Sequence, residues 1–266
     1  MIDELWLRSL HVSSIRHREL HPEHEDHVVF QASTIGALLE GSFEGDVAIA
    51  ELAEHGDLGV GTLNHLDGEL VVVDGDFLRA DASGSLAPVD PRRLTPFAAV
   101  AWFRPQIELT LPPGAGMDEL AGEANRLVPD HDQSLALRIE GRFQSIRGRS
   151  VPRQEPPYRP LPEVIEQQTV FEAEDVDATL VGFRFPDQST GLEAAGFHLH
   201  FATADRRRGG HVFGFRTEGE ARGALDTEAE LRVELPPGVE LEAPSIDDEL
   251  SAALGRVEGG GAAPGR

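Results

Sequence analysis

The chain has 266 residues, 40% of them hydrophobic and 26% charged, which is the composition of a globular protein with a sizeable core. It contains no cysteine, and its 23 basic residues are all arginine, so disulfides, thiolate metal ligands and every lysine-based covalent mechanism are excluded. The formal net charge of −24 repels phosphate backbones and anionic lipids, so we expect no nucleic acid and no membrane partner.

The same charge constrains the kind of site that the chain can offer. An anionic small molecule would approach against the overall field, so its site needs a locally positive centre, either a metal ion or arginine. No run of 18 apolar residues occurs, and the first residues, MIDELWLRSLHVSS, lack the basic and apolar regions of a secretory signal. We therefore expect a cytoplasmic protein.

The N-terminal part of the chain predicts one strand and two short helices. Residues 1–26 are polar and rich in histidine, and we expect a flexible surface segment there. A strand pattern begins at His27. Two short helices follow, each begun by a side chain that can cap it: Thr34–Leu39 and Asp46–Gly56.

The centre of the chain predicts antiparallel strands joined by tight turns. Residues 56–89 have the pattern of a meander of three or four strands, because Asp-Gly and Ser-Gly pairs separate short β-rich runs. A further strand is expected over 97–111, a helix over 117–127 and a long strand over 134–150.

A proline-rich segment, VPRQEPPYRPLP at 151–162, has five prolines in twelve residues, so we predict no regular structure there and a connection between two lobes. Strand patterns dominate beyond it, over 179–185, 196–203, 211–217 and 229–235. The expected fold is α+β, with two lobes built on mixed or antiparallel sheets and a few short helices. The N-terminal lobe would cover 27–150 and the C-terminal lobe 151–258, with 259–266 as a flexible tail.

The strongest chemical signal is the segment GFHLHFATADRRRGGHVFGF, residues 196–215. His198 and His200 are two apart in a strand pattern, so their side chains share one face. The polar segment ADRRRGG suits a hairpin loop, which would return His211 to a position close to His200. Three imidazoles on one face of this C-terminal hairpin can hold Zn²⁺ with a fourth position open to water or substrate, as in catalytic zinc sites.

Two other interpretations of the histidines stay open from spacing alone. A His-x-His pair in a strand is often two ordinary half-buried side chains without a metal. A second group of histidines leads up to the start of the first predicted strand, but its surroundings are polar, which favours a solvated segment over a metal site. This group consists of His17, His21, His24 and His27.

The runs FHLHF and GGH of this hairpin resemble the zinc-binding segment of the acetolactate decarboxylase family. Further blocks resemble that family in the same order: QASTIGALLEG (31–41), HGDLGVGTLNHLDGELVVVDG (55–75), TPFA (95–98), RGRSVPRQEPPYRPL (147–161) and VGFRFP (181–186). The resemblance implies a zinc-dependent carboxy-lyase that converts (S)-2-acetolactate to (R)-acetoin and carbon dioxide. Its partner would be the small-molecule substrate 2-acetolactate.

The resemblance also implies which residues form the site. The three histidines of the hairpin would bind one zinc ion. Glu69, Arg149 and Thr62 fall where the family has an active-site glutamate, arginine and threonine. A further catalytic glutamate lies near the family's C-terminus, where Glu258 is the best-placed candidate and Glu249 and Glu242 are neighbours.

The reaction explains why such groups would be needed. Loss of carbon dioxide leaves an electron pair on the substrate, and without thiamine, pyridoxal phosphate or lysine a zinc ion chelated by the ketone and hydroxyl oxygens can store it. Arg149 would hold the carboxylate through its guanidinium fork. Glu69 or Glu258 would deliver the proton, or Arg149 would direct it while the glutamates hydrogen-bond the hydroxyl.

Two other functions stay open at this point. A cupin-like metal isomerase or dioxygenase also uses His-x-His and a later histidine, but it usually places a glutamate soon after the pair, where only Asp205 is available. A zinc-stabilised binding module without catalysis would need the three histidines but neither Glu69 nor Arg149. An antiparallel chain with open sheet edges is also compatible with a homodimer.

Overall fold

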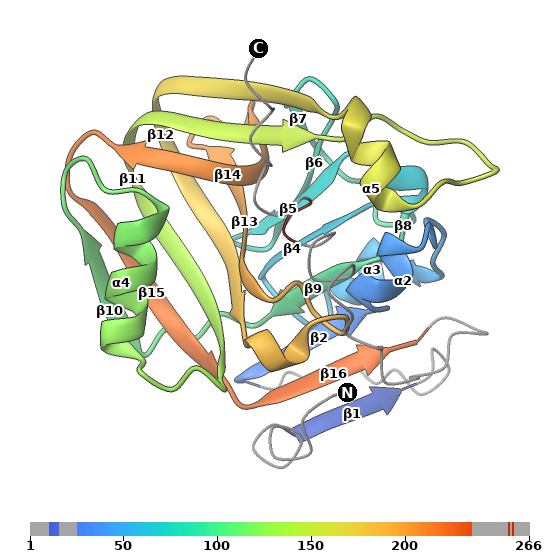
Figure 1. Ribbon diagram of the computed structural model, residues 1–266, viewed down its shortest axis with the longest axis horizontal. Coiled ribbons are helices and arrows are strands. Elements are labelled where there is room, and N and C mark those ends of the chain that lie inside the picture. Colours follow the sequence, from blue (N-terminus) through green and yellow to red (C-terminus); the bar gives the residue numbers. More distant parts are fainter. Residues whose placement is uncertain (1–10, 16–25, 236–254, 256, 258–266) are drawn as a thin grey trace.

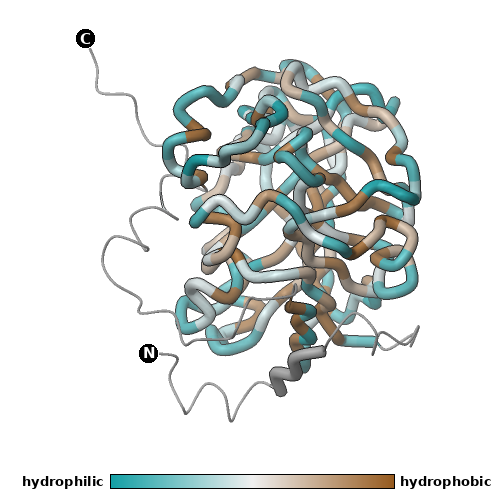
Figure 2. The backbone as a smooth tube through the Cα atoms, turned by 90° about the vertical axis from the view of Figure 1, so that its right-hand side faces the viewer, coloured by the Kyte–Doolittle hydropathy of each residue, from teal (hydrophilic) through white to brown (hydrophobic). Residues whose placement is uncertain are grey.

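Two β-sheets pack against each other, with short helices around them (Figure 1). The structure is a computed structural model and describes residues 11–15, 26–235, 255 and 257. Buried hydrophobic residues of both sheets form one cluster between them. The outer loops are largely hydrophilic (Figure 2). None of the helices in these described residues combines the length and the apolar content that crossing a bilayer requires.

The first sheet has eight strands among the described residues. Their order is β1 (His11–Ile15), β16 (Glu230–Glu234), β2 (Val28–Ala32), β9 (Ala98–Ala101), β4 (Leu58–Thr62), β5 (Glu69–Val73), β6 (Asp76–Ala80) and β7 (Leu86–Pro88). The pairs β1–β16 and β16–β2 are parallel, and the others are antiparallel. The sheet is therefore mixed, with its parallel part formed by strands from the two ends of the chain.

The second sheet is antiparallel and has six strands in the described part of the chain. Their order is β10 (Ile107–Leu111), β15 (Ala221–Glu228), β11 (Ser134–Ser150), β12 (Thr169–Phe185), β13 (Gly196–Thr203) and β14 (Gly209–Thr217). Because β14 also pairs with β11, the strands from β11 to β14 close on one another. Helix α4 (Met117–Leu127) packs Leu120 and Ala124 against the core of this sheet.

The remaining elements are short. Strands β3 (Val47–Ala48) and β8 (Leu94–Thr95) pair with each other. The helices are α2 (Ile35–Leu39), α3 (Ile49–Leu52) and α5 (Leu161–Val164), with 3₁₀ turns η2 (Asn64–Leu66), η3 (Ile165–Gln167) and η4 (Asp187–Ser189). Helices α2 and α5 share an apolar cluster with Phe97 and Val257. Helix α3 packs on the other face of the first sheet.

Much of the predicted fold is confirmed. The structure is α+β with mixed and antiparallel sheets and few short helices. Thr34 caps α2, because its hydroxyl accepts a hydrogen bond from the amide of Ala37 at 3.1 Å. The meander, α4 and the long strand β11 lie where the sequence predicts them.

Two predicted elements are wrong in a way that the pairing explains. The second helix begins after Ala48 and not at Asp46, because Val47 and Ala48 pair with β8 as a strand. The strand predicted over 97–111 is two strands, β9 and β10, which belong to different sheets. Pro105 lies between them and has no amide hydrogen to continue a ladder.

Several strands were not predicted. Residues 11–15, expected to be irregular, form β1, and β15 and the first half of β12 were also missed. Helix α5 begins inside the proline-rich segment, with a proline in its first turn. The division of the chain into lobes at residue 150 stays a prediction about domains; the sheets themselves draw strands from both sides of it, since β11 and β12 pair along their length.

Candidate active site

Three histidines from two neighbouring strands converge on one buried point. His198 and His200 alternate along β13, and His200 lies directly across from His211 of β14. The ring centroids are 5.2 to 5.4 Å apart, and one potential ligand atom of each ring lies within 4.8 Å of the others. All three residues are at most 6% exposed. Within the described part of the chain, this is the one group of histidine or acidic side chains close enough to hold a metal ion.

The orientation of His200 is fixed from the other sheet. Its Nδ1 lies 2.6 Å from the carbonyl oxygen of Leu70 in β5. Because a carbonyl can only accept, Nδ1 carries the proton and donates, and Nε2 keeps a lone pair. That Nε2 is buried and makes no hydrogen bond within the described part of the chain. A buried nitrogen lone pair with no donor facing it fits a metal ion.

The electrostatics of the site keep the rings of His198 and His200 in the form that binds a metal. Burial lowers the pKa of His198 to about 3, and the positive charge of Arg149 contributes to this shift. Burial also lowers the pKa of His200 well below its ordinary value, together with the charge of His198. Metal ligands must be neutral imidazoles, so at neutral pH protons do not compete for these nitrogens.

The β4–β5 connection brings Glu69 and Thr62 to the same point. They form a cross-strand pair, and each is 7% exposed. Glu69 Oε2 lies 3.7 Å from Nε2 of His200. The turn requires glycine at position 68, where φ is +88° and a Cβ would lie 2.2 Å from the carbonyl oxygen of Ala80. The hydroxyl of Thr62 donates to the carbonyl of Gly68 at 2.8 Å and so ties the turn to β4.

Arg149 comes from β11, where it lies across from His211. It is 5% exposed, its Nη1 is 3.9 Å from Glu69 Oε1, and its buried Nε makes no hydrogen bond to the described residues. Its Cζ is also 5.7 Å from the centre of the Phe213 ring, which lies on β14 at a β-bulge. A buried guanidinium with unused donor capacity beside three histidines can bind a carboxylate.

Four of these groups line one pocket between the two sheets. Its polar wall includes Thr62, Glu69, Arg149 and His198. Its apolar wall comes from the surrounding helices and loops and includes Ile35, Leu38, Leu66, Phe97, Val151, Leu161 and Val257. The ring of Phe97 lies parallel to that of His198, with centroids 6.5 Å apart. Such a pocket suits a small carboxylate with apolar substituents.

The structure brings together the three histidines, Glu69, Arg149 and Thr62, all singled out from the sequence. Glu258 lies outside the described residues, as do its neighbours Glu249 and Glu242. Val257, which directly precedes Glu258, is buried and lines the pocket.

The other histidines and acidic residues considered from the sequence are placed elsewhere or not described. Three members of the N-terminal histidine group, His17, His21 and His24, lie outside the described residues. The fourth, His27, contacts Asp226 through its Nδ1 at 2.8 Å. Asp205, the ligand that a cupin-like site would need, accepts a hydrogen bond from Thr203 in the β13–β14 loop.

Two aromatic residues of the site were not predicted. Phe97 and Phe213 contact His198 and Arg149, yet their surroundings in the sequence are those of core phenylalanines. Phe213 did carry one signal, because it follows His211 by two residues in a strand pattern. Its ring lies 5.5 Å from that of His211.

Comparison with known proteins gives a consistent result. The model of the alpha-acetolactate decarboxylase family matches residues 29–247. The chain is 40% identical over 236 residues to the alpha-acetolactate decarboxylase of Methylococcus capsulatus, covering 88% of this chain and 90% of that protein. It is 37% identical to that of Klebsiella aerogenes, covering 89% and 91%. The crystal structure of alpha-acetolactate decarboxylase from Bacillus subtilis superposes with a TM-score of 0.82 at 31% identity, covering 87% of this chain and 99% of that chain.

Proposed function

The chain belongs to the alpha-acetolactate decarboxylase family, and we propose that it carries out the family's reaction where the three histidines converge, beside the pocket that His198 lines. It is an enzyme of the carboxy-lyase class, which converts 2-acetolactate to acetoin and carbon dioxide. Its relatives support neither a cupin-like enzyme nor a non-catalytic binding module. The observation that carries the assignment of the site is the buried convergence of the histidines with an arginine and a glutamate.

We propose Zn²⁺ as the metal of this site. The described histidine nitrogens are close enough to hold an ion, and the chain has no cysteine to compete. Three neutral imidazoles are a donor set that zinc uses in catalytic sites. When bound, the ion would act as a Lewis acid toward the ketone and hydroxyl oxygens of the substrate and would accept negative charge as carbon dioxide leaves.

Arg149 is the group that we assign to the substrate carboxylate. Its planar guanidinium can donate two parallel hydrogen bonds, and its burial excludes the water that would compete for them. It also supplies the local positive charge that an anion needs in a chain of net charge −24. Carbon dioxide is neutral, so the charge-assisted bonds weaken once the carbon–carbon bond has broken, and the product can leave.

A proton must then reach the carbon that lost the carboxyl group. The carboxyl group of Glu69 lies between the histidines and Arg149, with Oε2 3.7 Å from Nε2 of His200 and Oε1 3.9 Å from Nη1 of Arg149. We propose that its carboxyl group delivers the proton or hydrogen-bonds the substrate hydroxyl, while Thr62 holds the turn that carries it. Delivery to one face would give (R)-acetoin from (S)-2-acetolactate. Glu258 is the second candidate donor.

The test uses the purified full-length protein, with metal analysis and a colour assay for acetoin. We expect stoichiometric zinc, loss of activity on chelation and recovery when zinc is added back. His211→Ala should lose both metal and activity, whereas His131→Ala, on an exposed loop, should lose neither. A zinc-loaded protein that forms no acetoin would contradict the function. Full activity of His211→Ala would contradict the assignment of the site but not the function.

A further inference from the structure

The turn that leads into Glu69 has a strained backbone. His65 and Leu66 have φ values of 68° and 52°, in the left-handed region, and Gly68 follows with φ of 88°. Residues with a side chain rarely adopt this region, and such conformations persist only where surrounding contacts impose them. Leu66, within this strained stretch, and Glu69, directly after it, both line the pocket.

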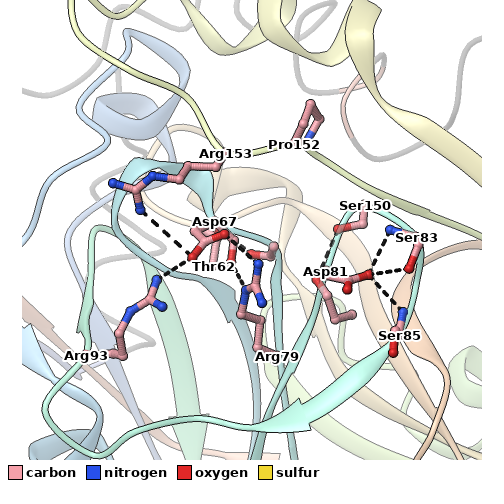
Figure 3. Close-up of polar contacts among 12 residues, drawn as sticks. Thr62, Asp67, Arg79, Asp81, Ser83, Ser85, Arg93, Ser150, Pro152 and Arg153 are labelled. Atoms are coloured by element: carbon pink, nitrogen blue, oxygen red, sulfur yellow. Dashed lines mark hydrogen bonds and ion pairs between the residues drawn. The ribbon is translucent and has the colours of Figure 1, made fainter.

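Asp67, in the middle of the turn, is held by three arginines (Figure 3). Arg79 donates from Nη2 to Oδ1 at 2.6 Å and from Nε to the backbone carbonyl of Asp67 at 2.7 Å. Arg93 donates from Nη2 to Oδ2 at 2.7 Å. Arg153 lies further away, with Nη1 3.9 Å from Oδ2. We call these four residues the Asp67 cluster.

The arginines of the Asp67 cluster come from three separate parts of the chain. Arg79 lies on β6, Arg93 between β7 and β8, and Arg153 in the proline-rich segment. Burial alone would raise the pKa of Asp67, but the hydrogen bonds from Arg93 and Arg79 outweigh it and lower this pKa. The carboxylate is therefore ionised at neutral pH and joins segments that the backbone alone does not connect.

The neighbouring turn shows what the cluster adds. Asp81, between β6 and β7, also organises a turn, but its hydrogen bonds come from Ser83 and Ser85 of the same turn (Figure 3). No pocket residue lies in that turn. The contacts of Asp67 instead reach across the chain and fix a residue two positions from Glu69.

We propose that Asp67 is a positioning residue for the reaction, which holds the strained turn so that Glu69 points at His200 and Arg149. This inference rests on the proposed function of Glu69. The arginines of the cluster orient the turn through Asp67, and Asp67 itself does not touch the substrate. Without the carboxylate, three guanidinium groups would face one another across the turn, and the backbone would relax toward ordinary φ values.

The experiment is a double-mutant cycle with zinc-loaded protein. Asp67→Asn should lower kcat by roughly tenfold to a hundredfold, the range for a catalytic group displaced by about 1 Å, with zinc content and folded structure retained. In a Glu69→Gln background, which has already lost the carboxyl group, Asp67→Asn should lower kcat by less than about twofold further. Asp81→Asn is the matched control and should leave kcat unchanged in both backgrounds.

A merely structural role for Asp67 would lower activity by the same factor in both backgrounds, and that result, or a parent-like kcat of Asp67→Asn, overturns the inference. A parent-like kcat of Glu69→Gln would instead overturn the proposed function of Glu69. If Asp67→Asn does not fold, Arg93→Ala removes one partner of Asp67 at a partly exposed position. Arg93→Ala should lower kcat several-fold only when Glu69 is present, and Arg93→Lys should recover part of this loss. Equal losses of kcat with and without Glu69 would again overturn the inference.

Discussion

Replacing Arg149 with lysine should slow the reaction without releasing the metal. The side chain is 5% exposed and lies across from His211, so a lysine there keeps the charge but not the planar fork. A hydrogen bond to a charged group contributes about 1.5 to 3 kcal/mol, so loss of one of the two bonds to the substrate carboxylate should lower kcat/KM by roughly 10- to 150-fold. Arg149→Ala loses both bonds and should lower kcat/KM by roughly 10² to 10⁴.

The assay is acetoin formation over a range of substrate concentrations, with zinc measured on the same preparations. Arg147→Lys is a matched control, because Arg147 lies on the same strand with its Cζ also 5.7 Å from the Phe213 ring, but it is exposed and does not line the pocket. We expect its kcat/KM to stay within about twofold of the parent. If Arg149→Lys retains the parent kcat/KM, or Arg147→Lys is equally slow, the assignment of the carboxylate to Arg149 is wrong.

Two further predictions concern stability. Burial raises the pKa of Glu193 to about 8 from an ordinary 4.5. The protonated carboxyl group therefore stabilises the fold in full below about pH 4.5. This stabilisation is lost as the pH rises through 8, by up to about 1.4 kcal/mol per pH unit. Glu193→Gln should remove this loss, and urea unfolding at about pH 5 and pH 8 would measure it; an unchanged slope would point to another group. Gly68→Ala should lower the melting temperature, because its Cβ would lie 2.2 Å from the carbonyl oxygen of Ala80. Gly122→Ala, in open space on α4, should instead raise the free energy of unfolding by about 0.4 to 1 kcal/mol. Equal melting temperatures of the two variants would refute this contrast.

The sequence predicts the convergence of the three histidines well because the information for it is local. A period of two places His198 and His200 on one face, and a polar loop ending in two glycines places His211 across from them. Helix α4 and strand β11 are also local patterns, with apolar residues at the spacing of one face. The pocket residues from other strands, Glu69 and Arg149, could be assigned only through the resemblance to a family.

What the sequence does not predict depends on contacts between distant residues. The pattern over 97–111 does not reveal that its two halves join different sheets. Strand β15 was missed because it carries acidic residues inward, and Asp226 is buried only because it accepts from the Arg104 amide and contacts His27. Asp67 has the sequence pattern of an ordinary turn residue, since its partners Arg79 and Arg93 are 12 and 26 positions away.

The direct pairs Arg149–His211 and His211–His200 form a row across three adjacent strands. Since side-chain direction reverses at every residue of a strand, a shift of β14 by one position would turn His211 to the opposite face. Gain or loss of a single residue between the start of β14 and His211 would therefore turn His211 away from the row, even if every pocket side chain were kept. The loop at 204–208 lies outside the row and can change length without this penalty. In this enzyme the geometry of the row depends on the spacing of its residues along the strand as much as on their identity.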